Sequence, residues 1–204
     1  MEIIRLTETD LDTAVRRTTE VLTQGGIVLY PTDTTYGLGV DATNQEALKR
    51  LKQLKGRDAA KPISILVKDR DMIRTYGIMN EQAQSLIARF LPGPLTLVLG
   101  ATDKVLKELN ALGEIGVRIP NEPFCTLLMQ RYPNPVTATS ANIAGREAER
   151  NIDQILSQFG PAQEEIALVI DAGERGNASS TVVSCVSDIP VILREGALTK
   201  EELW

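Results

Sequence analysis

Residues 27–37 read Ile27-Val28-Leu29-Tyr30-Pro31-Thr32-Asp33-Thr34-Thr35-Tyr36-Gly37, an unbroken apolar run followed by a segment rich in hydroxyl groups. Four consecutive apolar residues are typical of a β-strand that is buried on both faces of a sheet. We expect Pro31 to end this strand and a polar loop to follow. Ligand-binding loops in open α/β sheets lie at the carboxyl ends of strands. The stretch therefore predicts an α/β fold with a ligand site after this strand, and the alternative is a solvated turn.

The rest of the chain alternates short apolar runs with amphipathic segments, which indicates strands alternating with helices. Strands are expected at 3–6, 27–30, 63–67, 95–99, 116–119, 136–139, 166–170, 181–186 and 191–193. Helices are expected after the caps Asp10 and Asn44, at 81–90 and 122–130, from the cap Asn151 to 159, and at 199–204. The last two strands follow each other without a helix, so the sheet is predicted to be mixed. We expect one domain over residues 1–204.

The composition is that of an ordinary globular protein, with 204 residues, of which 43 % are hydrophobic and 24 % charged. No apolar run approaches the roughly 20 residues of a membrane span, and the first residues do not resemble a signal peptide. We therefore expect a soluble, cytoplasmic protein without a membrane partner. The net charge of −5 argues against a protein that binds nucleic acid over its whole surface, although a local basic cleft is compatible with it.

The sequence excludes several kinds of site. It contains no histidine and only two distant cysteines, so His-based triads and zinc sites of the usual spacing are ruled out. Cys125 and Cys185 are expected to be small buried residues. Gly37-Leu38-Gly39-Val40-Asp41-Ala42 matches a dinucleotide-binding pattern, but a loop precedes it and the next helix starts too late. No Walker sequence is present.

Positive side chains mark two candidate anion sites. Lys55-Gly56-Arg57 closes a predicted helix, where the two cations either complement the helix dipole or converge on phosphates. Arg118 lies inside an apolar strand, and a buried arginine requires a partner. That partner is either a structural carboxylate or a ligand anion.

Small polar residues follow several strands. Ser140 and Asn142 end the strand at 136–139, where they could contact sugar or phosphate oxygens or form an ordinary turn. The segments 179–181 and 193–196 have the same character. Each of these signals is weak by itself.

Taken together and in this order, the motifs resemble the YrdC-like family, which comprises the L-threonylcarbamoyladenylate synthases. The matching segments are 31–39, Lys55-Gly56-Arg57 with Lys61-Pro62, 91–96, 117–120, 139–142, 180–183 and 193–196. The resemblance extends from about Ile3 to Ala197 and is closest to the short, single-domain form. It implies a twisted mixed α/β sheet around a concave basic cleft.

The resemblance also implies an activity. Members make L-threonylcarbamoyl-AMP and pyrophosphate from L-threonine, bicarbonate and ATP. The product serves a downstream complex that modifies tRNA, which allows but does not require direct contact with RNA. ATP is a substrate, Mg²⁺ is expected to bridge its phosphates, and no metal ligand of the protein is expected.

Site residues are transferred by matching motif. The resemblance assigns Lys55 and Arg57 to the ATP phosphates as catalytic residues, and Ser140, Asn142 and Arg194 to the nucleotide. It assigns Thr32, Arg118 and Ser180 to threonine and its carbamate. Position 66 is leucine where some members have histidine, so that contact is not expected here.

Two other functions remain open from the sequence. The first is a non-catalytic RNA-binding module that uses the same cleft, against which the overall acidity and the 4 % aromatic content argue. The second is a different carbamoyl or adenylyl transferase. The expected chemistry needs charge neutralisation and positioning rather than a nucleophilic side chain, so the absence of histidine is no obstacle.

Overall fold

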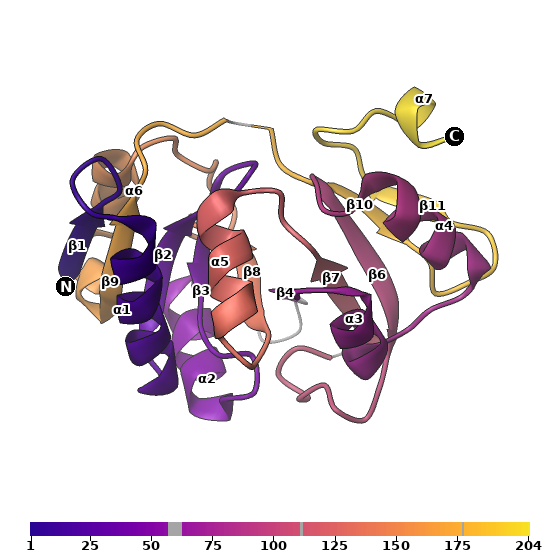
Figure 1. The fold of residues 1–204 in the computed structure, drawn as a ribbon, viewed down its shortest axis with the longest axis horizontal. Coiled ribbons are helices and arrows are strands. Elements are labelled where there is room, and N and C mark those ends of the chain that lie inside the picture. The colour runs from indigo at the N-terminus through magenta and orange to yellow at the C-terminus, as the bar shows by residue number, and fades with distance from the viewer. Residues whose placement is uncertain (57–62, 111, 177) are drawn as a thin grey trace.

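The computed structural model describes residues 1–56, 63–110, 112–176 and 178–204, and the strands in these residues form one mixed sheet (Figure 1). The strands are β1 (Glu2–Arg5), β2 (Ile27–Pro31), β3 (Tyr36–Gly39), β4 (Ser64–Leu66), β5 (Gly77–Ile78), β6 (Leu95–Ala101), β7 (Glu114–Arg118), β8 (Val136–Ser140), β9 (Ile166–Asp171), β10 (Thr181–Ser184) and β11 (Val191–Arg194). Their order is β1-β9-β2-β3-β8-β4-β7-β6-β10-β11, and β5 pairs with β6 beside this path. Parallel pairs such as β1–β9 and β4–β7 occur together with antiparallel pairs such as β2–β3, so the predicted mixed α/β sheet is confirmed.

Each α-helix in the described residues begins after a side chain that accepts a hydrogen bond from the first turn, which satisfies an otherwise unpaired amide. The helices are α1 (Leu11–Thr23), α2 (Gln45–Leu54), α3 (Arg70–Tyr76), α4 (Glu81–Phe90), α5 (Pro123–Arg131), α6 (Ile152–Phe159) and α7 (Lys200–Leu203), with a 3₁₀ turn η1 (Gly160–Glu165). The predicted caps Asp10, Asn44 and Asn151 are confirmed.

The strand β2 ends at Pro31 and a polar loop follows it, as predicted, but the loop is shorter than expected because β3 begins at Tyr36. β2 includes Pro31, and β3 returns antiparallel to it, with Pro31 opposite Tyr36. The glycines explain this hairpin: a Cβ on Gly39 would lie 2.7 Å from the Tyr30 ring and 2.8 Å from Val136. The glycine pattern thus leaves room for a buried tyrosine, rather than for a dinucleotide.

Besides β3, three short elements in the described residues have no counterpart in the sequence prediction, namely α3, β5 and η1. α3 spans only 7 residues and buries two hydrophobic side chains, Met72 and Ile73, which is too few to give a periodic pattern. β5 has only 2 residues. The predicted strand 181–186 ends earlier, at Ser184.

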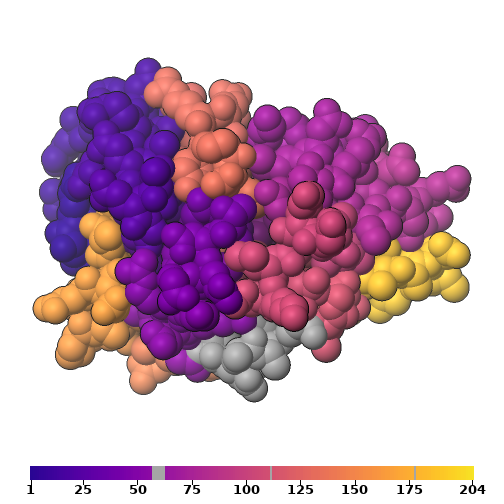
Figure 2. Space-filling model, turned by 90° about the horizontal axis from the view of Figure 1, so that it is seen from below, coloured from indigo at the N-terminus to yellow at the C-terminus, as the bar shows by residue number. Residues whose placement is uncertain are grey.

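Helices cover the two ends of the sheet differently. α1 and α5 lie side by side against the strands around β2 (Figure 1). At the other end α4 contacts β6, and Arg89 Nη1 donates to the Leu203 carbonyl of α7 over 3.0 Å. From below, indigo and orange segments occupy one end of the molecule and the yellow C-terminal segment the other (Figure 2). None of the helices in the described part of the chain is long and apolar enough to cross a membrane.

The middle of the sheet brings distant segments together. β8 pairs with β3 through Gly37 opposite Ser140, and with β4 through Ser64 opposite Ala138. The loop of the β2–β3 hairpin therefore lies beside the end of β8.

Candidate functional site

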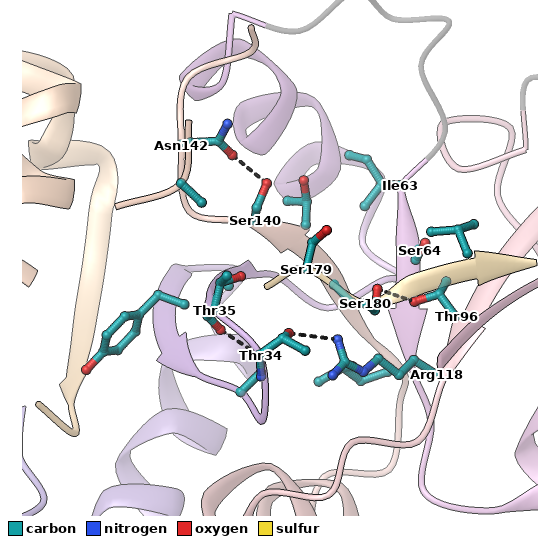
Figure 3. A pocket seen from close by; sticks show the side chains of 18 of the residues that line it. Thr34, Thr35, Ile63, Ser64, Thr96, Arg118, Ser140, Asn142, Ser179 and Ser180 are labelled. Carbon is teal, nitrogen blue, oxygen red and sulfur yellow. Dashed lines mark hydrogen bonds between the residues drawn. The ribbon is translucent and has the colours of Figure 1, made fainter. Parts of the chain in front are cut away.

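A polar cavity of about 590 Å³ lies between the hairpin loop, the end of β8 and the strands β4, β6, β7, β10 and β11 (Figure 3). Its lining consists of Tyr30, Thr32, Thr34, Thr35, Tyr36, Gly37, Ile63, Ser64, Leu66, Thr96, Arg118, Ala138, Thr139, Ser140, Asn142, Glu147, Ala148, Ser179, Ser180, Val182 and Arg194. Six of the eight predicted site residues are in this lining, namely Thr32, Arg118, Ser140, Asn142, Ser180 and Arg194. A cavity of this size suits a small ligand.

Thr32 organises the hairpin loop from inside. Its hydroxyl donates to the Thr35 carbonyl over 2.6 Å and accepts from the Thr34 amide over 3.1 Å. The three threonines are each 7 % exposed. Thr32 therefore has its hydrogen bonds within the loop, and its neighbours Asp33 and Thr34 contact the opposite wall.

Arg118 extends from β7 to this loop. Its Nη2 donates to Asp33 Oδ1 over 2.6 Å, its Nη1 to Thr34 Oγ1 over 3.1 Å and its Nε to the Gly93 carbonyl over 3.3 Å. The side chains of Arg118 and Asp33 are 7 % and 11 % exposed, so this ion pair is buried. Arg118 thus has a structural carboxylate partner and also lines the cavity. The sequence left two alternatives for the partner of this arginine, a structural carboxylate and a ligand anion, and the first does not exclude the second.

A second arginine lies beyond Ser180. Arg194 Nη2 donates to the Ser180 carbonyl over 2.8 Å, and the Ser180 hydroxyl lies 2.9 Å from Thr96 Oγ1. Burial, and then the positive charge of Arg118, lower the pKa of Arg194. The mutual repulsion of two cations on one cavity wall favours the binding of an anion there.

Ser140 and Asn142 form the other end of the cavity. The Ser140 hydroxyl donates to Asn142 Oδ1, as Figure 3 shows. Lys55 lies behind this turn, where its Nζ donates to the carbonyls of Ser140 and Asn142. Lys55 is outside the cavity lining, and Arg57 lies outside the described residues.

Several lining residues had no assigned role in the sequence analysis. Thr34 and Thr35 belong to the quoted loop, so their hydroxyl groups were a usable signal. Thr96 lies inside a buried strand, and only the fold reveals that it faces Ser180. Leu66, where the resemblance gave no reason to expect a histidine contact, also lines the cavity.

Among the described residues, the acidic side chains do not gather into a metal cluster, and both cysteines are buried. Within residues 1–56, 63–110, 112–176 and 178–204, no group of three His, Cys, Asp or Glu side chains could hold a metal ion. Cys125 and Cys185 are buried as predicted, at 0 % and 1 % exposure. Burial raises the pKa of the Cys125 thiol well above its usual value.

Sequence comparison finds one family and many relatives. The model of the Sua5/YciO/YrdC family, described as "Telomere recombination", matches residues 20–196. The threonylcarbamoyl-AMP synthase of Bacillus subtilis (strain 168) is 32 % identical over 94 % of this chain and 56 % of that protein. A putative threonylcarbamoyl-AMP synthase of Methanocaldococcus jannaschii is 33 % identical over 100 % of this chain and 95 % of that protein. The chain therefore spans little more than half of one relative and almost all of the other.

Structure comparison gives a similar result. The crystal structure of Pyrococcus abyssi Sua5 complexed with L-threonine superposes with a TM-score of 0.90 and 32 % identity. The match covers 99 % of this chain and 59 % of that one.

Proposed function

Since the chain belongs to the Sua5/YciO/YrdC family, we propose that it is an L-threonylcarbamoyladenylate synthase. It makes L-threonylcarbamoyl-AMP and pyrophosphate from L-threonine, bicarbonate and ATP. One observation carries the proposal. A single cavity extends from Arg118 and Arg194, near Ser180, to the turn that carries Ser140 and Asn142. A site for two anionic reactants must hold both within one enclosure.

We assign threonine to the end of the cavity that Arg118 lines, which is called the threonine end below. Arg118 is the main binding group there. A guanidinium has five N–H donors, and the contacts to Asp33, Thr34 and Gly93 use three of them. One N–H on each terminal nitrogen is then left to bind the carboxylate of threonine. The hydroxyl groups of Ser180 and of Thr34, which is on the hairpin loop facing Arg118, also line the cavity and can bind the amino acid's polar groups.

The nucleotide occupies the end of the cavity that Ser140 and Asn142 form. Their side chains suit sugar or phosphate oxygens, and Lys55 adds a positive charge behind them. Arg194, whose Nη2 donates to the Ser180 carbonyl, also lines the cavity and neutralises charge on the reacting carbamate and α-phosphate. These cations support the expectation of a basic cleft.

The reaction needs no covalent enzyme intermediate. The amine of threonine adds to CO₂ with loss of a proton, or condenses with bicarbonate with loss of water, to form a carbamate. A carbamate oxygen then attacks the α-phosphate, and pyrophosphate leaves. The protein holds the two anions together and protects the labile carbamate from water.

Mg²⁺ fits this site as a companion of ATP. The cavity lining contains one carboxylate, Glu147, which is too few for a cage built by the protein alone. Mg²⁺ commonly binds through substrate phosphates together with a few protein oxygens. Serine, threonine and asparagine oxygens of the lining could complete such a shell.

The product passes to a tRNA-modifying transferase complex.

The test is pyrophosphate release by the purified protein with Mg²⁺. We expect release to require threonine, bicarbonate and ATP together, and mass spectrometry to detect threonylcarbamoyl-AMP. Arg118→Met should lower kcat/KM by about 10²-fold, the scale of losing a preorganised charge contact. Arg131→Met is the matched control, because this exposed arginine contacts Asp12 on the surface. Release that is independent of threonine would contradict the proposal.

A further inference from the structure

Lys55 lies at the C-terminal end of α2 and is only 2 % exposed. Its ammonium group donates to the Ser140 carbonyl, to the Asn142 carbonyl over 2.8 Å and to Asn142 Oδ1 over 3.4 Å. An ammonium group has three N–H donors. The structure thus surrounds Nζ with three oxygen atoms from one turn, the turn that also carries the nucleotide-facing side chains.

The main chain of Lys55 contacts the same turn. The Ala144 amide donates to the Lys55 carbonyl over 2.9 Å. On the other side, Gln158 of α6 accepts from the Ile143 amide over 2.8 Å. The turn 140–144 is therefore fixed by the end of α2 and by α6, and Lys55 supplies both a side-chain and a main-chain contact.

The charge of Lys55 also matters for an anionic ligand. Two neighbouring carbonyl oxygens, those of Ser140 and Asn142, would repel a phosphate group bound at this turn. Lys55 turns both oxygens toward itself and compensates their partial negative charge, in a region of low exposure where such contacts are strong. Without the ammonium group, both carbonyls lose their charged donor.

We propose that Lys55 is a positioning residue, which holds the turn 140–144 so that Ser140 and Asn142 face the cavity. Its effect on nucleotide binding is then transmitted through the turn. This assignment rests on the proposed function for the identity of the ligand, but the fixed turn itself is independent of any ligand.

The experiment compares three variants with the wild type. Lys55→Met removes the ammonium group and keeps the length of the side chain. Ser140→Ala removes the hydroxyl but keeps the carbonyl that Lys55 contacts. Lys49→Met is the matched control, because Lys49 lies on the same helix and pairs with Glu46 at the surface. Hydrogen exchange of 141–146 is measured without ligands, and ATP and threonine binding are measured by calorimetry with Mg²⁺.

We expect Lys55→Met to raise the exchange rate of 141–146 about tenfold or more and to weaken ATP binding by at least tenfold, with threonine binding changed less than twofold. Ser140→Ala should weaken ATP binding while exchange of the turn stays at the wild-type rate. Lys49→Met should change neither quantity. In the enzyme assay, Lys55→Met should raise the KM for ATP more than the KM for threonine.

One combination of results would overturn the proposal that Lys55 acts through the turn. Wild-type exchange of 141–146 in Lys55→Met, together with weakened ATP binding, would mean that Lys55 contacts the nucleotide directly and would overturn the proposal. If Lys55→Met does not fold, Lys55→Gln, which keeps a shorter donor, is measured in the same way and should show intermediate protection. Faster exchange in the absence of synthase activity would contradict the proposed function and leave the positioning role intact.

Discussion

The ion pair between Arg118 and Asp33 connects strand β7 to the β2–β3 loop at the threonine end of the cavity. Asp33 Oδ1 accepts from Arg118, whereas Oδ2 is buried without a hydrogen-bond partner in the part of the chain that the structure describes. A buried carboxylate with one unpaired oxygen is costly by itself. Its neighbour Arg118 compensates that cost, and in return the carboxylate fixes the direction of the guanidinium group.

We therefore expect Asp33→Asn to fix the orientation of the Arg118 guanidinium group less firmly, although the amide still offers an oxygen acceptor. Threonine binding should weaken about tenfold, or ~1.4 kcal/mol, because a charge-assisted hydrogen bond becomes a neutral one. Calorimetry with threonine measures the change. Asp71→Asn is the control, since Asp71 pairs with Arg74 at an exposed site. Equal threonine affinity in Asp33→Asn and wild type would show that Asp33 does not orient Arg118.

Glu122 offers a test of pH dependence. Its Oε2 caps α5 by accepting from the Cys125 amide over 2.9 Å, and burial raises its pKa above the usual 4.5. A carboxyl whose pKa is raised by folding contributes stability below pH 4.5, and this contribution is lost as pH rises through the folded value. At neutral pH the buried charge therefore destabilises the protein.

Glu122→Gln keeps an oxygen acceptor for the cap and removes the charge. We expect the free energy of unfolding of the variant, relative to wild type, to increase as pH rises from about 5 to about 8. Urea unfolding at several pH values measures this difference. The exposed Glu46→Gln serves as the control. A difference that falls with pH would mean that the charged form of Glu122 is stabilised by folding.

Individual residues could be predicted from the sequence where burial demands a partner. Arg118 inside an apolar strand indicated an ion pair or a ligand, and it has both an ion pair and a place in the cavity wall. Thr96 gave no such signal, because threonine is common in buried strands without any ligand. Its role depends on Ser180, which is 84 positions away along the chain.

At the scale of elements, the strands and helices with clear caps or apolar runs were predictable, whereas the β2–β3 hairpin was not. Pro31 suggested the end of pairing, because proline cannot donate to a ladder. The structure places Pro31 at the last position of β2, opposite Tyr36, where the hairpin loop begins. The decisive contact, the Tyr30 ring against Gly39, joins two strands and cannot be recognised in a local window.

This contact predicts the effect of Gly39→Ala. The new methyl group would lie under 3 Å from both Tyr30 and Val136, which are buried and have little room to move. We expect a loss of about 1–3 kcal/mol in the free energy of unfolding. Because β3 carries the hairpin loop, threonine binding should weaken as well.

Gly100→Ala is the matched control for this prediction, since its Cβ would lie 3.7 Å from Ile78, an ordinary contact distance. Urea unfolding of both variants decides the point. If Gly39→Ala is as stable as Gly100→Ala, the packing of Tyr30 does not explain the glycine.

At the scale of the whole molecule, the cavity combines segments from Thr32 to Arg194. No periodicity or spacing reveals that they meet, because their neighbourhood depends on the strand order β3-β8-β4-β7-β6-β10-β11. Only the resemblance to a family grouped them in advance. It could not show that Lys55 contacts the back of the Ser140–Asn142 turn, which is a property of the folded chain.

The charge of the whole chain leads to a last prediction, which addresses RNA binding. The net charge is −5, and the described lining of the cavity carries two cations, Arg118 and Arg194, each of which also bonds a neighbour. Two cations are few for a chain of phosphates, and the two tyrosines of the described lining, Tyr30 and Tyr36, are each only 1 % exposed, so they offer little surface for bases to stack on. We expect unmodified tRNA to bind no more tightly than the roughly 10⁻⁴–10⁻⁶ M typical of non-specific contacts at physiological salt. Filter binding over a range of salt concentrations measures the affinity, and Arg118→Met should leave it unchanged while abolishing threonine binding. Nanomolar affinity with a steep salt dependence that disappears in Arg118→Met would instead assign the cavity to RNA.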